Sequence, residues 1–385
     1  MQLEKLKKIL TDNGELKFRL SQIQKAIYQD GVSDFSEIST ISKNLRETLE
    51  KEMKILSFEV EKVLVSKDKS SLKALLKLAD GNKIESVLLS PMPARNATHS
   101  VAGGEKKWSV CISSQVGCPL NCSFCATGKG GLQRNLTAEE ITDQVLFWRQ
   151  YIRKQGTGNS EQEKNAPHPS DSVTWQNQNL LIKERGQISN IVYMGMGEPF
   201  LNWEEVKKSL RDLVDKNLFA FGSRSISVST AGIPEGLKNL AEEFPQINLA
   251  ISLHFATDEK RNRFMPINKK YNLEELKGAL KDYFSKTNRQ IFFEYVLLSG
   301  INDSEEDAYA LSTYLKSIGH RQLLHVNLIA YNETGEEFKA SSGNKTHLFK
   351  DFLEKGGMSV TIRKSLGQEV AGACGQLAGN KLKIF

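Results

Sequence analysis

Apolar residues near the start of the chain recur every three or four positions, the spacing of one face of a helix. Two such runs lie on either side of a turn at Gly31. Their apolar positions are Leu16, Leu20, Ile23 and Ile27 in the first run, and Ile38, Ile41, Leu45 and Leu49 in the second. The pattern predicts a small helical module over residues 1–55. Its basic side chains suit a solvated face, which we favour, or a surface that meets phosphates.

The apolar runs become shorter after this module. Residues 56–105 predict a connecting region of short strands, with strands at 72–78 and 84–89 on either side of the turn Asp80-Gly81-Asn82. The second of these strands contains Glu85, and a glutamate in a strand usually faces solvent.

From Trp108 onward, strand patterns alternate with helix patterns, the arrangement that builds a parallel sheet. Strands are expected near 108–113, 190–194, 224–230, 247–254, 291–297 and 324–330. The run Thr137-Ala138-Glu139-Glu140 fits a capping box and marks the first helix. Six such units over residues 106–385 predict an α/β fold, an incomplete (β/α)6 barrel. A polar stretch near 154–187 with little periodicity predicts a surface insertion.

Within the expected strands, small polar residues share one face and bulky apolar residues share the other. The polar face carries Ser109, Cys111 and Ser113 in the first strand, Ser225, Ser227 and Ser229 in the third, and Asn248, Ala250, Ser252 and His254 in the fourth. An ordinary sheet with one solvated face would give the same pattern. Helices cover the outside of a parallel sheet, however, so the polar face is expected to line an inner cavity.

The composition of the chain limits which cellular compartments and binding partners are expected. The chain has 385 residues, 39% of them hydrophobic, which is enough for a globular core. No apolar run is long enough for a membrane span or a signal segment, and the five cysteines suit a reducing cytoplasm. We therefore expect a cytoplasmic protein with no membrane partner. A net charge of +6 permits a nucleic-acid partner without requiring one.

Three cysteines follow the first barrel strand with the spacing C-x3-C-x2-C, namely Cys118, Cys122 and Cys125. Thiolates at this spacing can hold one face of a [4Fe-4S] cluster and leave the fourth iron free to bind a small molecule. A structural zinc site normally needs four ligands, and no second cysteine pair or nearby histidine supplies them here. A disulfide framework belongs to short secreted chains.

Further candidates lie where later strands end. The turn Met194-Gly195-Met196-Gly197-Glu198-Pro199 lets the backbone approach a ligand, and Glu198 offers a carboxylate to an ammonium group. Ser229 and the run Ser252-Leu253-His254 also lie where strands end and offer polar groups to a ligand. The remaining cysteines, Cys111 and Cys374, are either ordinary thiols or reactive ones. Cys374 lies in a glycine-containing segment that is expected to be flexible.

Taken together, these motifs resemble the radical S-adenosylmethionine (SAM) enzymes, whose free iron chelates the amino and carboxylate groups of SAM. Within them, the chain most resembles the dual-specificity RNA adenosine methyltransferases of the RlmN type. The similarity is carried by residues 116–128, 194–199, 229–232, 251–254, 265–270 and 373–379. Residues 18–51 are also similar to the helical accessory domain of that family, which is implicated in RNA binding.

The resemblance implies a radical SAM catalytic domain over residues 106–385, with a [4Fe-4S] cluster, SAM and a reducing electron donor. The implied substrates are 23S ribosomal RNA and transfer RNA, methylated at carbon 2 of an adenosine. The SAM contacts that it implies are Gly197, Glu198, Ser229, Ser252, Leu253, His254 and Asn332.

The resemblance also implies the order of the chemistry. Cys374 takes a methyl group from one SAM, and the cluster reduces a second SAM to a 5′-deoxyadenosyl radical. That radical removes a hydrogen from the S-methyl group, and the carbon radical left behind adds to the adenine. Glu85 then accepts the ring proton. Cys111 attacks the sulfur of Cys374 and releases the product, which leaves a transient disulfide.

Two other functions are compatible with parts of this pattern. A Cfr-type enzyme would methylate carbon 8 of adenosine, but Pro199 resembles the RlmN type, whereas alanine is expected at this position in the Cfr type. A non-catalytic RNA-binding protein would keep the cluster as a structural element. The joint presence of Cys111, Cys374 and Glu85 argues against that second alternative.

Overall fold

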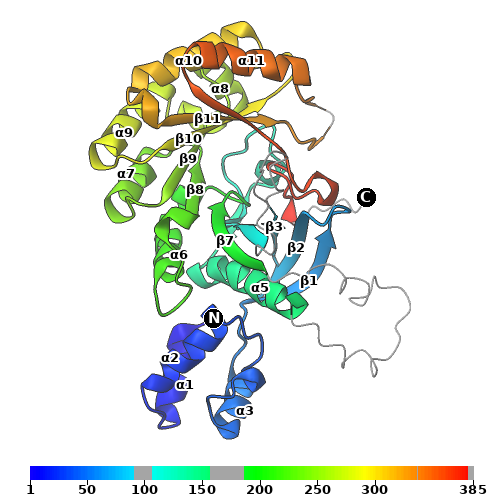
Figure 1. Ribbon diagram of the computed structural model, residues 1–385, viewed down its shortest axis with the longest axis vertical. Coiled ribbons are helices and arrows are strands. Elements are labelled where there is room, and N and C mark those ends of the chain that lie inside the picture. Colours follow the sequence, from blue (N-terminus) through cyan, green and yellow to red (C-terminus); the bar gives the residue numbers. More distant parts are fainter. Residues whose placement is uncertain (91–105, 157–185, 336, 380–385) are drawn as a thin grey trace.

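A computed structural model describes residues 1–90, 106–156, 186–335 and 337–379. The helical module lies at one end of the molecule, and the strands of the connecting region and the barrel domain form the rest (Figure 1). Among the described residues, no helix combines the length and the apolar character needed to cross a membrane. The predicted polar insertion lies largely outside the described residues.

The helical module contains a helix, α1, ahead of the first apolar run that the sequence pattern identified. Its elements are α1 (Leu3–Asp12), α2 (Phe18–Gln24), a π-helical turn (Lys25–Gln29) and α3 (Lys43–Glu52). Leu16 was expected on the buried face of a helix, but it precedes α2 and is 65% exposed. Ile38 and Ile41 are buried as expected, although α3 starts only after Ser42, whose side chain accepts a hydrogen bond from the Leu45 amide.

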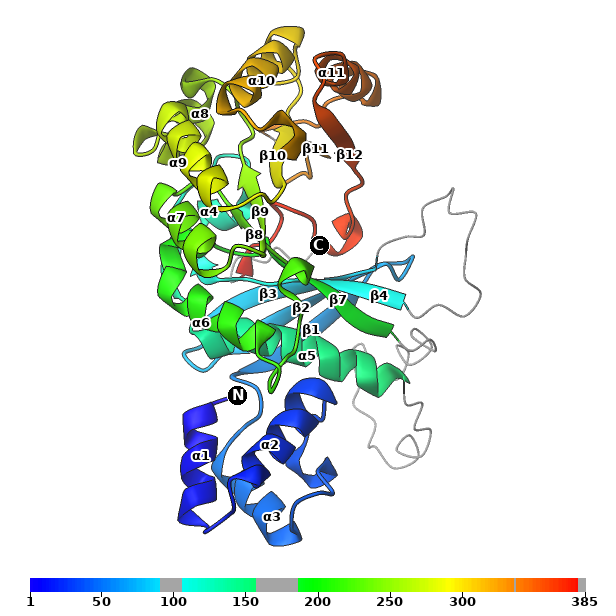
Figure 2. The ribbon, with the colours of Figure 1, turned by 60° about the vertical axis from the view of Figure 1, so that its left-hand side comes forward.

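The module packs on a helix of the barrel domain, α5 (Ala138–Gly156), as Figure 2 shows. The Gln150 amide donates to the carbonyl of Val32 at 2.9 Å, and Arg153 forms an ion pair with Glu37 at 2.7 Å. Arg149 donates to the carbonyl of Tyr28. Each of these contacts joins α5 to the module, so the two parts are held together by several polar bonds.

Ten strands of the described residues form a continuous sheet in the order β1-β2-β3-β4-β7-β8-β9-β10-β11-β12. The strands from β4 to β12 run parallel to their neighbours, whereas β1 to β3 extend the sheet with antiparallel pairs. Their bounds are β1 (Phe58–Val65), β2 (Ser71–Leu78), β3 (Lys83–Leu89), β4 (Lys106–Cys111), β7 (Gly186–Tyr193), β8 (Ile226–Thr230), β9 (Asn248–Ser252), β10 (Ile291–Leu297), β11 (Leu324–Ala330) and β12 (Ser359–Arg363). The short strands β5 (Gln115–Gly117) and β6 (Leu132–Asn135) form a separate hairpin.

Helices follow the parallel strands and cover the outer face of the curved sheet (Figures 1 and 2). They are α5, α6 (Trp203–Val214), α7 (Pro234–Glu243), α8 (Asp258–Phe264), α9 (Leu273–Lys286), α10 (Glu305–Ile318) and α11 (Gly343–Lys355). The short helix α4 (Ala126–Lys129) lies at the cavity instead. The predicted incomplete α/β barrel is therefore confirmed, with six strand–helix units from β4 to α11. The seventh parallel strand, β12, was not predicted.

The start of α5 is set by the capping box that the sequence predicted. Thr137 and Glu140 form the predicted capping box, since the Glu140 amide donates to the Thr137 hydroxyl at 3.2 Å and the Thr137 amide donates to the Glu140 carboxylate at 3.0 Å. Helix α5 runs on to Gly156, so the first residues assigned to the polar insertion are helical instead. Trp108 and Val110 are buried on the outer face of β4, which confirms that the apolar face of the strand packs against helices.

Candidate active site

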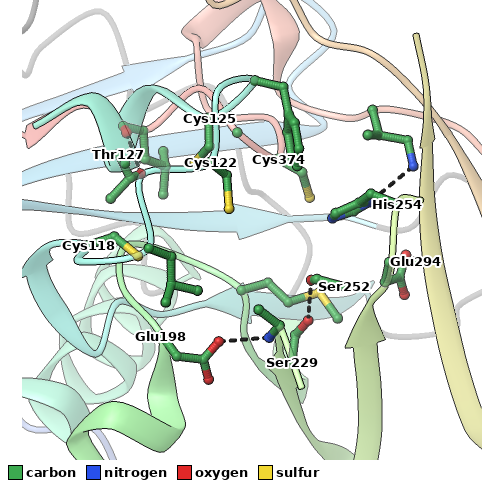
Figure 3. A pocket seen from close by; sticks show the side chains of 18 of the residues that line it. Cys118, Cys122, Cys125, Thr127, Glu198, Ser229, Ser252, His254, Glu294 and Cys374 are labelled. Carbon is green, nitrogen blue, oxygen red and sulfur yellow. Dashed lines mark hydrogen bonds between the residues drawn. The ribbon is translucent and has the colours of Figure 1, made fainter. Parts of the chain in front are cut away.

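A cavity opens at the carboxyl ends of the parallel strands, where functional sites of α/β barrels lie. It brings together side chains from almost the whole length of the barrel domain (Figure 3). Those predicted from the sequence are Cys118, Cys122, Cys125, Gly197, Glu198, Ser229, Ser252, His254, Asn332 and Cys374. Residues separated by more than 200 positions therefore converge on one space, as the pattern of polar strand faces predicted.

The three clustered cysteines occupy the loop between β5 and α4 and carry free thiols. Figure 3 shows Cys118 apart from Cys122 and Cys125 on one side of the cavity. Burial raises the pKa of Cys118 to about 12, so iron binding must displace the thiol proton. Three thiols in one loop beside a cavity are a donor set that a [4Fe-4S] cluster with one open iron can use.

The glycine turn after β7 fits closely against the neighbouring loop. A Cβ atom at Gly195 would lie 2.6 Å from the carbonyl oxygen of Ile112. Gly197 has a φ of +102°, and a Cβ atom there would lie 2.6 Å from the Cβ of Gln115. The Gln115 side chain in turn accepts a hydrogen bond from the Glu198 amide at 2.8 Å. Only glycine allows this backbone to lie so close to its neighbours, and the closeness fixes Glu198 in place.

Glu198 presents a buried carboxylate to the cavity. Its two oxygens accept hydrogen bonds from the amides of Ala231 at 2.7 Å and Phe200 at 3.1 Å. Burial raises the pKa of this carboxyl to about 7, and the two amide bonds oppose that rise. A desolvated carboxylate that is already oriented by backbone amides is a strong partner for an ammonium group.

His254 follows β9 in the left-handed backbone region, with a φ of +57°. Its Nδ1 accepts a hydrogen bond from the Val296 amide at 3.1 Å, and the Asn302 side chain donates to its carbonyl oxygen at 2.8 Å. Burial lowers the pKa of the imidazole to about 3. The ring is therefore neutral and carries its proton on Nε2, which leaves an N–H available to a ligand.

The other predicted SAM contacts differ in position. The hydroxyls of Ser229 and Ser252 are 3.2 Å apart and both face the cavity. Asn332 donates to the carbonyl oxygen of Cys374 at 3.0 Å and so joins the strand end to that segment. Leu253 does not line the cavity, because its side chain is buried and its carbonyl accepts a hydrogen bond from Arg261.

A charged pair that lines the cavity, Glu294 and Arg363, was not predicted. Glu294 on β10 accepts a hydrogen bond from Asn327 at 2.9 Å and forms an ion pair with Arg363 on β12 at 3.3 Å. Glu294 is 4% exposed and interrupts an apolar strand, Ile-Phe-Phe-Glu-Tyr-Val-Leu. A carboxylate inside such a run is the signal that marks this position, because an unpaired buried charge is costly.

A second cavity lies beside the first, and Cys374 lines both. Cys111 lines the second cavity, together with Arg363 and Ala373. Burial raises the pKa of the Cys111 thiol. The segment that carries Cys374 was expected to be flexible, but the structure holds it by hydrogen bonds to the cysteine loop, from the Ala126 amide to the Gly375 carbonyl at 2.8 Å and from the Thr127 hydroxyl to the Leu377 carbonyl at 2.6 Å.

Glu85 lies outside both cavities. A strand glutamate was expected to face solvent, but the side chain of Glu85 is fully buried, on β3. It forms an ion pair with Lys73 at 2.7 Å and accepts a hydrogen bond from the Ala378 amide at 2.7 Å.

Comparison with known proteins identifies the family of the chain. Residues 1–55 match the family model of the ribosomal RNA large subunit methyltransferase N-terminal domain, and residues 161–311 match that of the radical SAM superfamily. A radical SAM methyltransferase from Sphaerobacter thermophilus has a similar crystal structure, with a TM-score of 0.81 and 33% sequence identity. The match covers 98% of this chain and 97% of that one.

Curated relatives extend over the whole chain. A probable dual-specificity RNA methyltransferase RlmN from Thermoanaerobacter sp. is 38% identical over 100% of this chain and 98% of its own length. A ribosomal RNA large subunit methyltransferase N from Nitrosopumilus maritimus is 35% identical over 97% of this chain and 96% of its own length. The cofactors of such an enzyme, a [4Fe-4S] cluster and SAM, fit the thiols, the glycine turn and the oriented carboxylate of the cavity. Because relatives of this identity match nearly the whole chain and the fold agrees, the chain belongs to the RlmN family of radical SAM RNA methyltransferases.

Proposed function

We propose that this enzyme methylates carbon 2 of adenosine in 23S ribosomal RNA and in transfer RNA, with Cys374 as the methyl carrier. The observation that carries the proposal is the position of Cys374. Its side chain lines the cavity of the three clustered cysteines and also the neighbouring cavity of Cys111. The sulfur of Cys374 can therefore face the cofactors in one cavity and the thiol of Cys111 in the other.

The residues of the cavity support a SAM site. The Glu198 carboxylate would accept from the SAM ammonium group, and the Nε2–H of His254 and the hydroxyls of Ser229 and Ser252 would hold other polar groups. Gly197 and the side chain of Asn332 would complete the contacts. Leu253 would take part only indirectly, by fixing the backbone between Ser252 and His254.

Each of the remaining site residues has one defined step. The sulfur of Cys374 attacks the SAM methyl carbon, and the bond between that carbon and the SAM sulfonium breaks with its electron pair leaving on sulfur. When bound, the cluster supplies the single electron that starts the radical chemistry. Addition of the Cys374-bound carbon radical to the adenine ring leaves one unpaired electron, which would return to the cluster when it is bound, while Glu85 takes the ring proton. The thiolate of Cys111 then attacks the Cys374 sulfur. The electron pair of the bond between that sulfur and the transferred carbon leaves on the carbon, which takes up a proton to become the methyl group, and the two sulfurs remain as a disulfide.

That disulfide must be reduced before the next cycle, and the cluster must be supplied with electrons. We therefore propose a cellular electron donor and a reducing compartment, the cytoplasm, as partners of the reaction. The Cfr-type alternative, with carbon 8 as the target, differs in the product alone and is an outcome of the test below.

The test is nucleoside mass spectrometry after anaerobic incubation of the reconstituted enzyme with SAM, a reductant and either ribosomal or transfer RNA. We expect 2-methyladenosine from both RNA classes. Cys374→Ala should keep the absorbance of the cluster and the binding of SAM but form no product. Finding 8-methyladenosine would move the enzyme to the Cfr type, and turnover by Cys374→Ala would exclude Cys374 as the methyl carrier.

A further inference from the structure

Two buried charges hold both ends of the segment that carries Cys374. The ammonium of Lys73 donates to the carbonyl of Ala371 at 3.1 Å. The carboxylate of Glu85 accepts from the amides of Ala378 at 2.7 Å and Gly379 at 3.3 Å. Lys73 and Glu85 also form an ion pair at 2.7 Å, so the two anchors are joined to each other. We call this pair, with the segment 371–379 that it holds, the clasp.

The positions of Lys73 and Glu85 on the sheet explain the pairing. Lys73 lies opposite Val87 across β2 and β3, and Glu85 lies opposite Leu75, so both side chains project from the same face. Their side chains are 2% and 0% exposed. Buried charged side chains are usually paired with an opposite charge, as these two are. Lysine is rarely buried so fully without such a partner.

The clasp also keeps Glu85 away from the cavities. Neither Lys73 nor Glu85 lines the cavity of the cysteines or that of Cys111. An adenine bound in the cavity could not pass its ring proton to Glu85, because Lys73 and two backbone amides already surround the Glu85 carboxylate. Glu85 can accept that proton only after the segment 371–379 has moved away from it.

We propose that Lys73 is a positioning residue that holds Cys374 in the cavity for methyl loading, and that opening of the clasp uncovers Glu85 for the later proton transfer. This inference rests on the proposed roles of Cys374 and Glu85. In the closed clasp, Ala371 and Ala378 are fixed on either side of Cys374, so its sulfur is held toward the cavity. In the open clasp, the carboxylate of Glu85 is free to meet the target base.

Proton transfer favours the open state. When the proton from the adenine ring binds a Glu85 oxygen, the carboxylate becomes a neutral acid, and its ion pair with Lys73 is lost. The oxygen that bears the proton becomes a donor and can no longer accept both backbone amides. Proton transfer from the adenine therefore keeps the clasp open until Glu85 has released the proton.

The first test measures hydrogen exchange by mass spectrometry on the full-length reconstituted enzyme without RNA. Lys73→Met should raise the exchange rate of the backbone amides in 371–379 at least tenfold, while exchange in β10 stays as in the wild type. Lys77→Met is the matched control, because Lys77 lies on the same strand and is exposed. Unchanged exchange in 371–379 with an intact β10 would overturn the clasp, whatever the activity of the enzyme.

A second measurement follows methyl loading, read as the mass of the Cys374 peptide after incubation with SAM and without RNA. Lys73→Met should slow loading at least tenfold, and Lys73→Arg should recover much of the rate because it retains a charged donor. A general loss of packing would not be repaired by arginine. If the wild type loads no methyl group, the proposed function fails, whereas the exchange experiment still decides the clasp.

The Lys73→Met protein leaves Glu85 buried without its partner and risks failing to fold. The double variant Lys73→Met, Glu85→Gln removes both charges and avoids that problem. It too should show raised exchange in 371–379, because methionine cannot donate to the Ala371 carbonyl. Wild-type exchange in a folded double variant would count against the proposal.

Discussion

Substituting Gly197 by alanine tests whether the glycine turn shapes the SAM site. A Cβ atom at this position would lie 2.6 Å from the Cβ of Gln115 and 2.9 Å from its backbone nitrogen, and the φ of +102° disfavours any side chain. The backbone term costs about 1–2 kcal/mol. Overpacking against Gln115 adds about 1–3 kcal/mol. The expected loss of stability is therefore about 2–5 kcal/mol.

Gly300 offers a matched control. It also has a positive φ, of +73°, but nothing lies within 4 Å of the Cβ atom that alanine would add. Gly300→Ala should therefore show the backbone term alone, about 1–2 kcal/mol. The difference between the two variants isolates the close approach to Gln115.

The assay combines thermal unfolding with SAM binding by equilibrium dialysis under anaerobic conditions. Gly197→Ala should unfold at a clearly lower temperature than Gly300→Ala and should bind SAM at least tenfold more weakly, because Gln115 holds the amide of Glu198. Gly300→Ala should bind SAM as the wild type does. Equal unfolding temperatures for the two variants, with normal SAM binding, would refute the role given to the turn.

Three further outcomes are expected. Glu198→Gln should weaken SAM binding about 10–100-fold, since a charged hydrogen bond is worth about 1.5–3 kcal/mol. The control is Glu204→Gln, because Glu204 is exposed. If Glu198→Gln bound SAM as tightly as the wild type does, Glu198 could not contact the SAM ammonium group. The pKa of His254 is about 3 in the fold and near 6.5 when unfolded, so the unfolded chain binds more protons between these values and stability falls as pH drops. In urea unfolding of the metal-free protein, the free energy of unfolding of the wild type should fall by about 2 kcal/mol more than that of His254→Gln between pH 7 and pH 5. An equal fall in both proteins would contradict a buried neutral imidazole. Cys111→Ala should accumulate a covalent protein–RNA adduct, and a denaturing gel without a shifted band would count against the release step.

The barrel was predictable because its strands bury one face under helices. The alternation of Ser227 and Ser229 with Ile226 and Val228 reports that geometry directly, and it placed the polar side chains around the cavity. β12 escaped because its five residues include Ser, Thr and Arg and lack an apolar run. Strand order and partners depend on contacts far apart in the sequence, which local patterns do not contain.

Some site residues were predictable from local sequence patterns, and others were not because their partners are distant in the sequence. The clustered cysteines are adjacent in sequence, so their spacing predicted a shared role. Lys73 could not be found, since a lysine in a strand normally reaches solvent and its burial depends on Glu85 and on a segment about 300 residues further along the chain. The same holds for Arg363, whose partner Glu294 lies on another strand.

The hydrogen bonds that join the cysteine loop to the end of the chain constrain the order of assembly during synthesis. Thr127 donates to the carbonyl of Leu377, 250 positions later. The ribosome makes the loop 250 residues before the residue that fastens it. A growing chain would therefore expose three loosely held thiols until Leu377 has also been made. Iron and sulfide would find a finished cradle only after Leu377 has left the ribosome, so cluster loading would follow synthesis of the whole segment from Cys118 to Leu377.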